Sequence, residues 1–145
     1  MAPTMNGIGL AVADMATSLS FYRRLGLDFP AGSENEPHAE AELPGGIRLM
    51  IDTHASIIGF DPSHTPGAGH RDGASLAFLC ADPAEVDSVY AGLVAAGYQG
   101  GKEPWDAFWG QRYAVVRDPD GYQVDLFAWV KTRAQVNELE PRSTS

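Results

Sequence analysis

The strongest constraint on this sequence is an internal repeat. Asp14 and Asp82 lie 68 residues apart, and the same offset relates Tyr22 to Tyr90. Further along the chain the offset becomes 75, where a Pro-Gly-Gly turn corresponds to a Pro-Asp-Gly turn. A repeat of this kind predicts two similar modules, each built from one supersecondary unit.

Each module begins with a predicted strand that is followed by a predicted helix. Residues 6–13 and 74–81 alternate between larger apolar residues and small or polar ones, which is the period of a half-buried strand. Asp14 and Asp82 come next and are suited to be N-cap residues. Apolar side chains at helical spacing then continue until a glycine ends each pattern. These two glycines are Gly26 and Gly97.

Each module also ends in a predicted β-hairpin. Residues 37–52 alternate on both sides of a Gly-Gly turn, and residues 109–129 alternate around an Asp-Pro-Asp-Gly turn. The first strand of the second hairpin is expected to begin at Trp109, with Trp105 just before it. We therefore predict an α+β fold in which two tandem βαβββ modules form a mixed, curved sheet around a concave groove.

The repeat sets the expected domain boundaries. Residues 1–53 form the first βαβββ module and residues 74–130 the second. Residues 54–73 are rich in Pro and Gly and are expected to be an inter-module loop. Three histidines in that loop have no metal-ligand spacing and are expected to face solvent; they are His54, His64 and His70. A polar C-terminal tail is expected over residues 131–145.

Composition excludes several classes of protein. The chain carries a formal charge of −9 and has a pI near 4.7, which disfavours binding to nucleic acid or to an anionic membrane. The sequence contains no apolar run of membrane-spanning length and no signal peptide pattern, so a cytoplasmic location is expected. The single cysteine, Cys80, excludes an internal disulfide and is expected to be buried and inert.

The acidic residues are concentrated between positions 28 and 61. Seven of them lie there against one base, Arg48. A charged surface of this kind often serves only to keep a protein in solution. It is also suited to attract a cationic small ligand. The acidic residues are Asp28, Glu34, Glu36, Glu40, Glu42, Asp52 and Asp61.

Two stretches carry a family resemblance that covers about residues 6–130. GLAVADMATSLSFYRRLGL and RYAVVRDPDGYQVDLF resemble the two modules of the vicinal oxygen chelate superfamily, which includes glyoxalases, dioxygenases and bleomycin-resistance proteins. The resemblance implies metal-ligand positions at Gly7, Met50, Ser75 and Asp125. Only Asp125 can bind a divalent ion, whereas such a site needs three or more ligands. We therefore predict no metal and no cofactor, although His38, Glu40 and Asp125 remain a substitute ligand set.

The expected groove is lined by side chains that alternate along the strands of both hairpins. Trp109 and Tyr113 are expected to stack on a flat ligand, and Asp125 to fix its polar edge. Alternatively, the tryptophans fill the core between the modules or form a subunit interface. The predicted ligand-binding residues are His38, Glu40, Arg48, Met50, Asp52, Trp105, Trp109, Gln111, Tyr113, Asp125 and Phe127.

These features favour the drug-binding branch of the superfamily. The sequence is similar to mitomycin-resistance and bleomycin-resistance proteins, which implies sequestration of a planar or cationic antibiotic without chemical change. It also implies a homodimer, with or without a swapped N-terminal strand or module. The alternative is a superfamily enzyme, a glyoxalase-like lyase or isomerase or a dioxygenase, with an atypical or absent metal site. In that case Asp125 and Glu40 would act as acid and base. A third possibility is a binding module for an unrelated metabolite.

Overall fold

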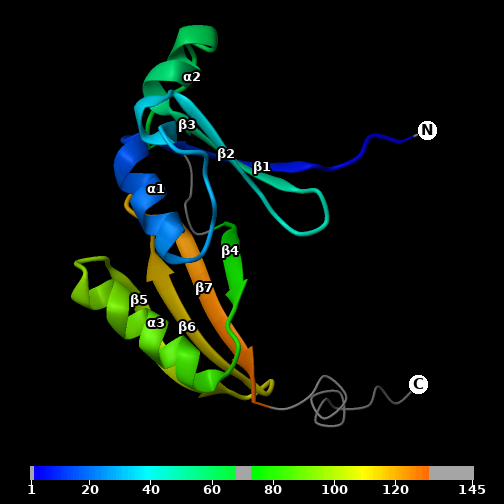
Figure 1. Cartoon of the computed structure of the whole chain (residues 1–145), viewed down its shortest axis with the longest axis vertical. Coiled ribbons are helices and arrows are strands. Elements are labelled where there is room, and N and C mark those ends of the chain that lie inside the picture. Colours follow the sequence, from blue (N-terminus) through cyan, green and yellow to red (C-terminus); the bar gives the residue numbers. More distant parts are fainter. Residues whose placement is uncertain (1, 68–72, 131–145) are drawn as a thin grey trace. The chain divides into compact units, whose positions relative to one another are not determined.

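The chain divides into two compact units, residues 1–70 and 71–145, each with its own sheet. The computed structural model describes residues 2–67 and 73–130. Within these ranges the first unit combines several helices, and the second unit one helix, with a mixed sheet, as Figure 1 shows, and the predicted α+β class is confirmed. The predicted C-terminal tail and His70 lie outside the described residues.

The first unit starts with strand β1 (Gly7–Val12), followed by helix α1 (Met15–Arg24). The Asp14 side chain caps the helix by accepting a hydrogen bond of 2.9 Å from the Thr17 backbone N–H. The chain leaves the helix at Gly26, whose φ of 88° is in the left-handed region that favours glycine. The predicted start and end of this helix are confirmed. Its buried face consists of Met15, Ser18, Leu19, Phe21 and Tyr22.

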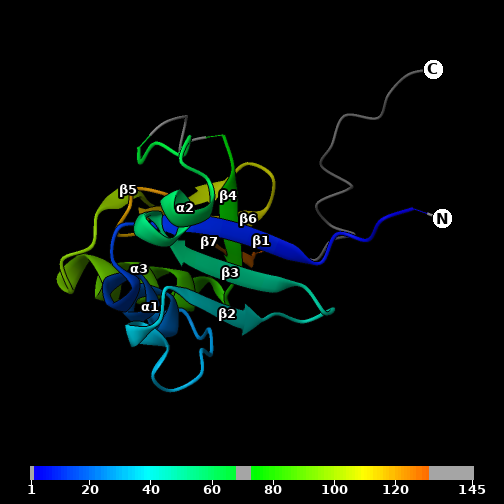
Figure 2. The same ribbon diagram turned by 90° about the horizontal axis from the view of Figure 1, so that it is seen from above.

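The three-stranded sheet of the first unit has the order β1-β3-β2. Strands β2 (His38–Glu42) and β3 (Arg48–Thr53) form the predicted antiparallel hairpin, and β3 pairs in parallel with β1. Figure 2 shows β3 between the other two strands. Alternation along the hairpin buries one face against the core and leaves the other polar. The buried residues of this hairpin are Ala39, Ala41, Leu49 and Ile51.

Two details of the first unit differ from the prediction. A short 3₁₀ helix, η1 (Ser33–Asn35), lies between α1 and β2, where the βαβββ pattern predicts a strand. Residues 2–67 therefore contain three strands instead of the predicted four. The predicted loop begins with a helix, α2 (His54–Phe60), whose N-cap Thr53 accepts a hydrogen bond from the Ser56 N–H. Because Thr53 is both the last residue of β3 and the N-cap of α2, the strand passes directly into the helix.

The second unit contains all the predicted elements of a βαβββ module. Strand β4 (Ser75–Leu79) leads into helix α3 (Pro83–Ala95), and then come β5 (Gly100–Ala107), β6 (Gln111–Arg117) and β7 (Gln123–Trp129). The sheet order is β4-β7-β6-β5, and α3 packs along one face of it (Figure 1). The side chains buried between α3 and that face include Val86 and Leu93 of the helix and, on the strands, Ala114, Val116, Val124, Leu126 and Ala128.

The hairpin of β5 and β6 corrects the predicted position of Trp109. Ala107 pairs with Gln111, so residues 108–110 form the turn and Trp109 lies outside both strands. Gly110 has a φ of 89°, and its N–H donates to the Ala107 carbonyl at 3.0 Å. A glycine in this conformation closes a three-residue hairpin loop, which prevents β6 from starting at Trp109. Trp105, expected before the strand, lies within β5.

None of the helices in residues 2–67 and 73–130 combines the length and the apolar character that crossing a bilayer requires.

Cys80 is buried directly after β4, and burial raises the pKa of its thiol. A thiol of this kind is a poor nucleophile.

Candidate functional site

Each sheet has one face turned away from its own helix, and the two faces have different chemistry. In the first unit this face carries charged side chains, four of which we call the polar row: Asp52, His38, Glu40 and Arg48. In the second unit aromatic side chains gather on this face and on the adjoining β5–β6 turn, and four of them we call the aromatic cluster: Trp105, Trp109, Tyr113 and Phe127. All eight residues are among the predicted ligand-binding residues. Alternation along β2 and β3 brings the polar row together, whereas the aromatic cluster also depends on the irregular strand β5 and on the β5–β6 turn.

Tyr113 is the centre of the aromatic cluster. Its ring centroid lies 5.5 Å from that of Trp105, 5.6 Å from that of Trp109 and 6.1 Å from that of Phe127. Tyr113 and Phe127 are nearly parallel, at 24°, whereas Trp109 meets Tyr113 edge to face, at 76°. Both arrangements are favourable for aromatic pairs. The cluster therefore provides a continuous aromatic surface built from β5, the β5–β6 turn, β6 and β7.

Asp125 lies beside the cluster and is held by three donors. The Tyr113 hydroxyl donates to its Oδ2 at 2.5 Å, the Ser75 hydroxyl donates to the same oxygen at 3.1 Å, and the Gln123 amide donates to Oδ1 at 2.9 Å. Asp125 is only 5% exposed. Burial, followed by the hydrogen bond to Asp125, raises the pKa of Tyr113, so its hydroxyl remains a donor at neutral pH. Asp125 thus orients Tyr113.

Trp109 is also fixed by a hydrogen bond. Its indole Nε1–H donates to Gln111 Oε1 at 2.6 Å. The ring of Phe108 stands edge-on to Trp109 with a centroid separation of 5.1 Å, and Phe108 is itself 90% exposed. The turn therefore presents an aromatic side chain whose orientation is set by Gln111, the first residue of β6.

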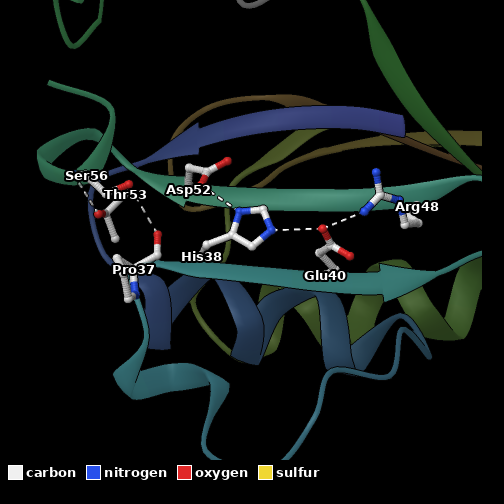
Figure 3. Close-up of polar contacts among 7 residues, drawn as sticks. All are labelled: Pro37, His38, Glu40, Arg48, Asp52, Thr53 and Ser56. Carbon is white, nitrogen blue, oxygen red and sulfur yellow. Dashed lines mark hydrogen bonds and ion pairs between the residues drawn. The ribbon is translucent and has the colours of Figure 1, made fainter. Parts of the chain in front are cut away.

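The polar row is a continuous chain of hydrogen bonds across β2 and β3 (Figure 3). His38 Nδ1 lies 2.7 Å from Asp52 Oδ1, and His38 Nε2 lies 2.9 Å from Glu40 Oε1. The Arg48 guanidinium donates to the same Glu40 oxygen at 2.7 Å. Met50 lies between these residues on β3, paired with Glu40. The four charges are thereby arranged in alternating sign along the row.

Geometry sets the protonation state of His38. Carboxylates only accept hydrogen bonds, and a neutral imidazole has one donor, so bonds to both Asp52 and Glu40 require the imidazolium. The hydrogen bonds to Glu40 and then to Asp52 raise the pKa of His38, and the hydrogen bond from His38 lowers the pKa of Glu40. His38 is thus held as a cation between two anions.

Two further features of the first unit were not predicted. A pocket of about 460 Å³ is lined by Asp28, Pro30, Glu40, Glu42 and Arg48, so it shares only two residues with the predicted site. His54 and His64, expected to face solvent separately, contact each other instead, with Nδ1 of one 2.8 Å from Nε2 of the other. Ten residues separate them in sequence, and α2 together with the turn after it brings them together.

The residues at the implied metal-ligand positions do not fit a metal ion. In the second unit, Ser75 and Asp125 are adjacent but bonded to each other. In the first unit, the Met50 methyl group lies 2.6 Å from where a Cβ on Gly7 would be, so a thioether occupies the space of a ligand there. Neither a methionine and glycine pair nor a fully engaged carboxylate suits a hard or borderline ion. His38 and Glu40 are likewise bonded to each other, and no group of three His, Cys, Asp or Glu within the described ranges is arranged to hold a metal.

Lys102 contacts the aromatic cluster and was not among the predicted ligand-binding residues. Its Nζ lies 4.0 Å from the centroid of the Trp105 ring. The spacing of three residues would place the two side chains on opposite faces of a regular strand. Only the irregular pairing of β5 reveals that they share a face.

Comparison of the chain with known proteins identifies its family. The family description "Glyoxalase/Bleomycin resistance protein/Dioxygenase superfamily" matches residues 4–126. None of the curated proteins compared with the chain matches it.

Solved structures show the same fold at low identity. A glyoxalase-related enzyme from Fulvimarina pelagi is 22% identical, with a TM-score of 0.71 over 88% of each chain. A glyoxalase/bleomycin resistance protein/dioxygenase from Nocardioides is 24% identical, with a TM-score of 0.65 over 90% of this chain and 86% of that one. A hypothetical protein from S. aureus is 18% identical, with a TM-score of 0.70 over 88% of this chain and 94% of that one. Since the family match extends from before β1 into β7, the chain belongs to the glyoxalase/bleomycin resistance protein/dioxygenase superfamily.

Proposed function

We propose that the chain binds a planar or cationic small molecule, of the mitomycin or bleomycin class of antibiotic, on the aromatic cluster and holds it unchanged. The observation that carries this proposal is the continuous surface formed by Trp105, Trp109, Tyr113 and Phe127. A flat ligand gains most from stacking on such a surface, because each ring offers a large apolar area at little cost in side-chain entropy.

The fixed polar groups support binding without chemistry. A general base must be able to reach the proton that it removes, and Asp125 already accepts three hydrogen bonds. The hydroxyl of Tyr113 and the indole N–H of Trp109 are also engaged. These groups hold the aromatic rings in place, which lowers the entropic cost of binding. That the polar row lines the same groove, and that the protein forms a homodimer, stay predictions.

The rival proposal is an enzyme of the superfamily. The hydrogen bond between His38 and Asp52 favours it, because a carboxylate that orients an imidazole is a common arrangement for proton transfer. Glu40 blocks the other ring nitrogen of His38. A substrate would have to displace Glu40 before this imidazole could act.

A titration with mitomycin C and bleomycin tests the proposal. Tryptophan fluorescence should be quenched with saturation, Trp109→Ala should weaken binding at least about tenfold, and mass analysis should recover the drug unaltered. Trp129→Phe is the control, since Trp129 is the last residue of β7 and its ring lies 6.5 Å from that of Phe127. Equal binding by wild type and Trp109→Ala would contradict the site. Recovery of a modified drug would favour the enzyme instead.

A further inference from the structure

Lys102 places a positive charge on the aromatic cluster. Its ammonium lies over the Trp105 ring, with Nζ 4.0 Å from the ring centroid. A cation over the face of tryptophan is attracted by the negative potential of the π system. Among the ion pairs of residues 2–67 and 73–130, none includes Lys102. The indole face is therefore the partner that orients this ammonium.

An irregularity of β5 creates the contact. Lys102 pairs with Val115, and Trp105 pairs with Tyr113, so three steps along β5 correspond to two along β6. The extra residue is a β-bulge, and it returns Lys102 to the face that carries Trp105. Pro104, which has no N–H to donate to a ladder, lies inside the irregular segment. The backbone thus directs the ammonium onto the indole.

The charge of the surroundings decides which ligand this arrangement suits. The protein has a net charge of −9, and the Asp125 carboxylate accepts a hydrogen bond from the hydroxyl of Tyr113, whose ring centroid lies 5.5 Å from that of Trp105. This field favours the approach of cations. The Lys102 side chain has a flexible four-carbon stem, so its ammonium can leave the ring and return to water. The face that it leaves is then available to another cation.

We propose that the face of Trp105 is a cation subsite, which the Lys102 ammonium occupies until a cationic ligand displaces it. This inference rests on the proposed function and names its ligand class: a flat molecule with a positively charged nitrogen beside an aromatic ring. Lys102 acts as an internal competitor for this face, and its charge also repels an approaching cation, so it weakens the binding of cations most. A ligand without charge must also displace the ammonium but is not repelled by it, so it gains less when Lys102 is removed.

Three small aromatic probes of different charge test whether the Trp105 face selects cations. Phenyltrimethylammonium is cationic, N,N-dimethylaniline has a similar shape and is neutral near neutral pH, and benzoate is anionic. Each is titrated into the full chain, and the indole N–H signals of Trp105 and Trp109 are followed by NMR. The variants are Lys102→Met, which removes the charge but keeps most of the length, and Lys102→Arg, which keeps the charge. Repeating the titrations at about 1 M salt, where the screening length is about 3 Å, removes long-range effects of the altered net charge.

Lys102→Met should bind phenyltrimethylammonium about two- to fivefold more tightly than wild type, because the free energy of an exposed cation–π contact corresponds to a change of about that size in the dissociation constant. Binding of dimethylaniline should tighten less than binding of the cation, binding of benzoate should not tighten, and Lys102→Arg should behave like wild type. Unchanged or weaker binding of the cation by Lys102→Met overturns the inference. Loss of benzoate binding in that variant also overturns it, by making Lys102 an anchor for anions.

The same titrations distinguish failure of this inference from failure of the proposed function. If all probes shift the indole signals equally in every variant, the aromatic cluster binds ligands and Lys102 has no competing role. If no probe shifts the indole signal of Trp105 or Trp109 in any variant, both the proposed function and the cation subsite are wrong.

Discussion

The two sheets of this protein share a plan but present opposite chemistry on the faces turned away from their helices. The polar row pairs each charge with a neighbour of opposite sign, whereas the aromatic cluster packs three rings around that of Tyr113. At the matched position of the repeat, Met50 in one unit corresponds to Asp125 in the other. The comparison teaches that the repeat preserves the apolar face of each sheet, while the other face is free to change.

The first way to test the comparison is to remove matched core residues. Ile51 and Leu126 correspond at the offset of 75, and both are fully buried. Ile51→Ala and Leu126→Ala should each lower the free energy of unfolding by about 2–5 kcal/mol, since a cavity is left in a packed core. Chemical denaturation measures the loss. Leu79→Ala, at a residue that is 64% exposed, is the control and should change stability little. A small effect at only one of the two core positions would show that the units do not share an equivalent core.

The second test removes one hydroxyl from the aromatic cluster. Tyr113→Phe keeps the ring but leaves the buried Asp125 with one donor fewer, which should cost about 1–3 kcal/mol in unfolding free energy. Ser75→Ala, which removes the longer hydrogen bond to the same oxygen, should cost less. If Tyr113→Phe is as stable as wild type, Asp125 does not depend on this donor.

The third test, with the smallest expected effect, concerns how the polar row makes the stability of the protein depend on pH. The folded-state pKa of His38 lies above its ordinary value of 6.5, so its stabilising contribution is complete below about pH 6.5 and is lost as the pH rises through the raised pKa. The side chain is 45% exposed, which limits the size of the contribution. Melting temperatures between about pH 6 and pH 9 should fall more in wild type than in His38→Asn.

Direct titration of the His38 imidazole by NMR provides the companion measurement. A midpoint above 6.5 is expected, and Asp52→Asn should lower it because one of the two accepting carboxylates loses its charge. A midpoint at or below 6.5 in wild type would contradict the description of the polar row as a closed chain of charges.

Sequence periodicity predicted the elements whose pattern is regular. The capped helices α1 and α3 and both final hairpins follow from Asp14, Asp82 and the glycine-containing turns, and all four are confirmed. The same alternation predicted that His38, Glu40 and Asp52 share a face. These successes depend on local rules, namely a capping side chain, a turn residue and a period of two.

The predictions from sequence are wrong or incomplete where the backbone is irregular. The sequence of β5, GGKEPWDA, contains two glycines and a proline, and its pairing shifts register twice, so no period of two is visible. Trp105 was therefore placed outside the strand and Lys102 was overlooked. Trp109 was misplaced because the conformation of Gly110 depends on how the hairpin closes. The contact of His54 with His64 requires the fold of α2 and the turn after it, which no spacing rule describes.

The irregular β5 strand also protects the sheet of the second unit from uncontrolled growth. An edge strand exposes unpaired backbone groups that can recruit a strand from another molecule, and proteins limit this with bulges, proline and charged side chains. β5 is an edge strand with two register shifts, a proline and three charged residues, whereas the opposite edge, β4, is the regular and uncharged segment SLAFL. Of the two edges of this sheet, β4 is therefore the better suited to pair with a further strand. The bulge that aims Lys102 at Trp105 is thus also a safeguard against aggregation along β5.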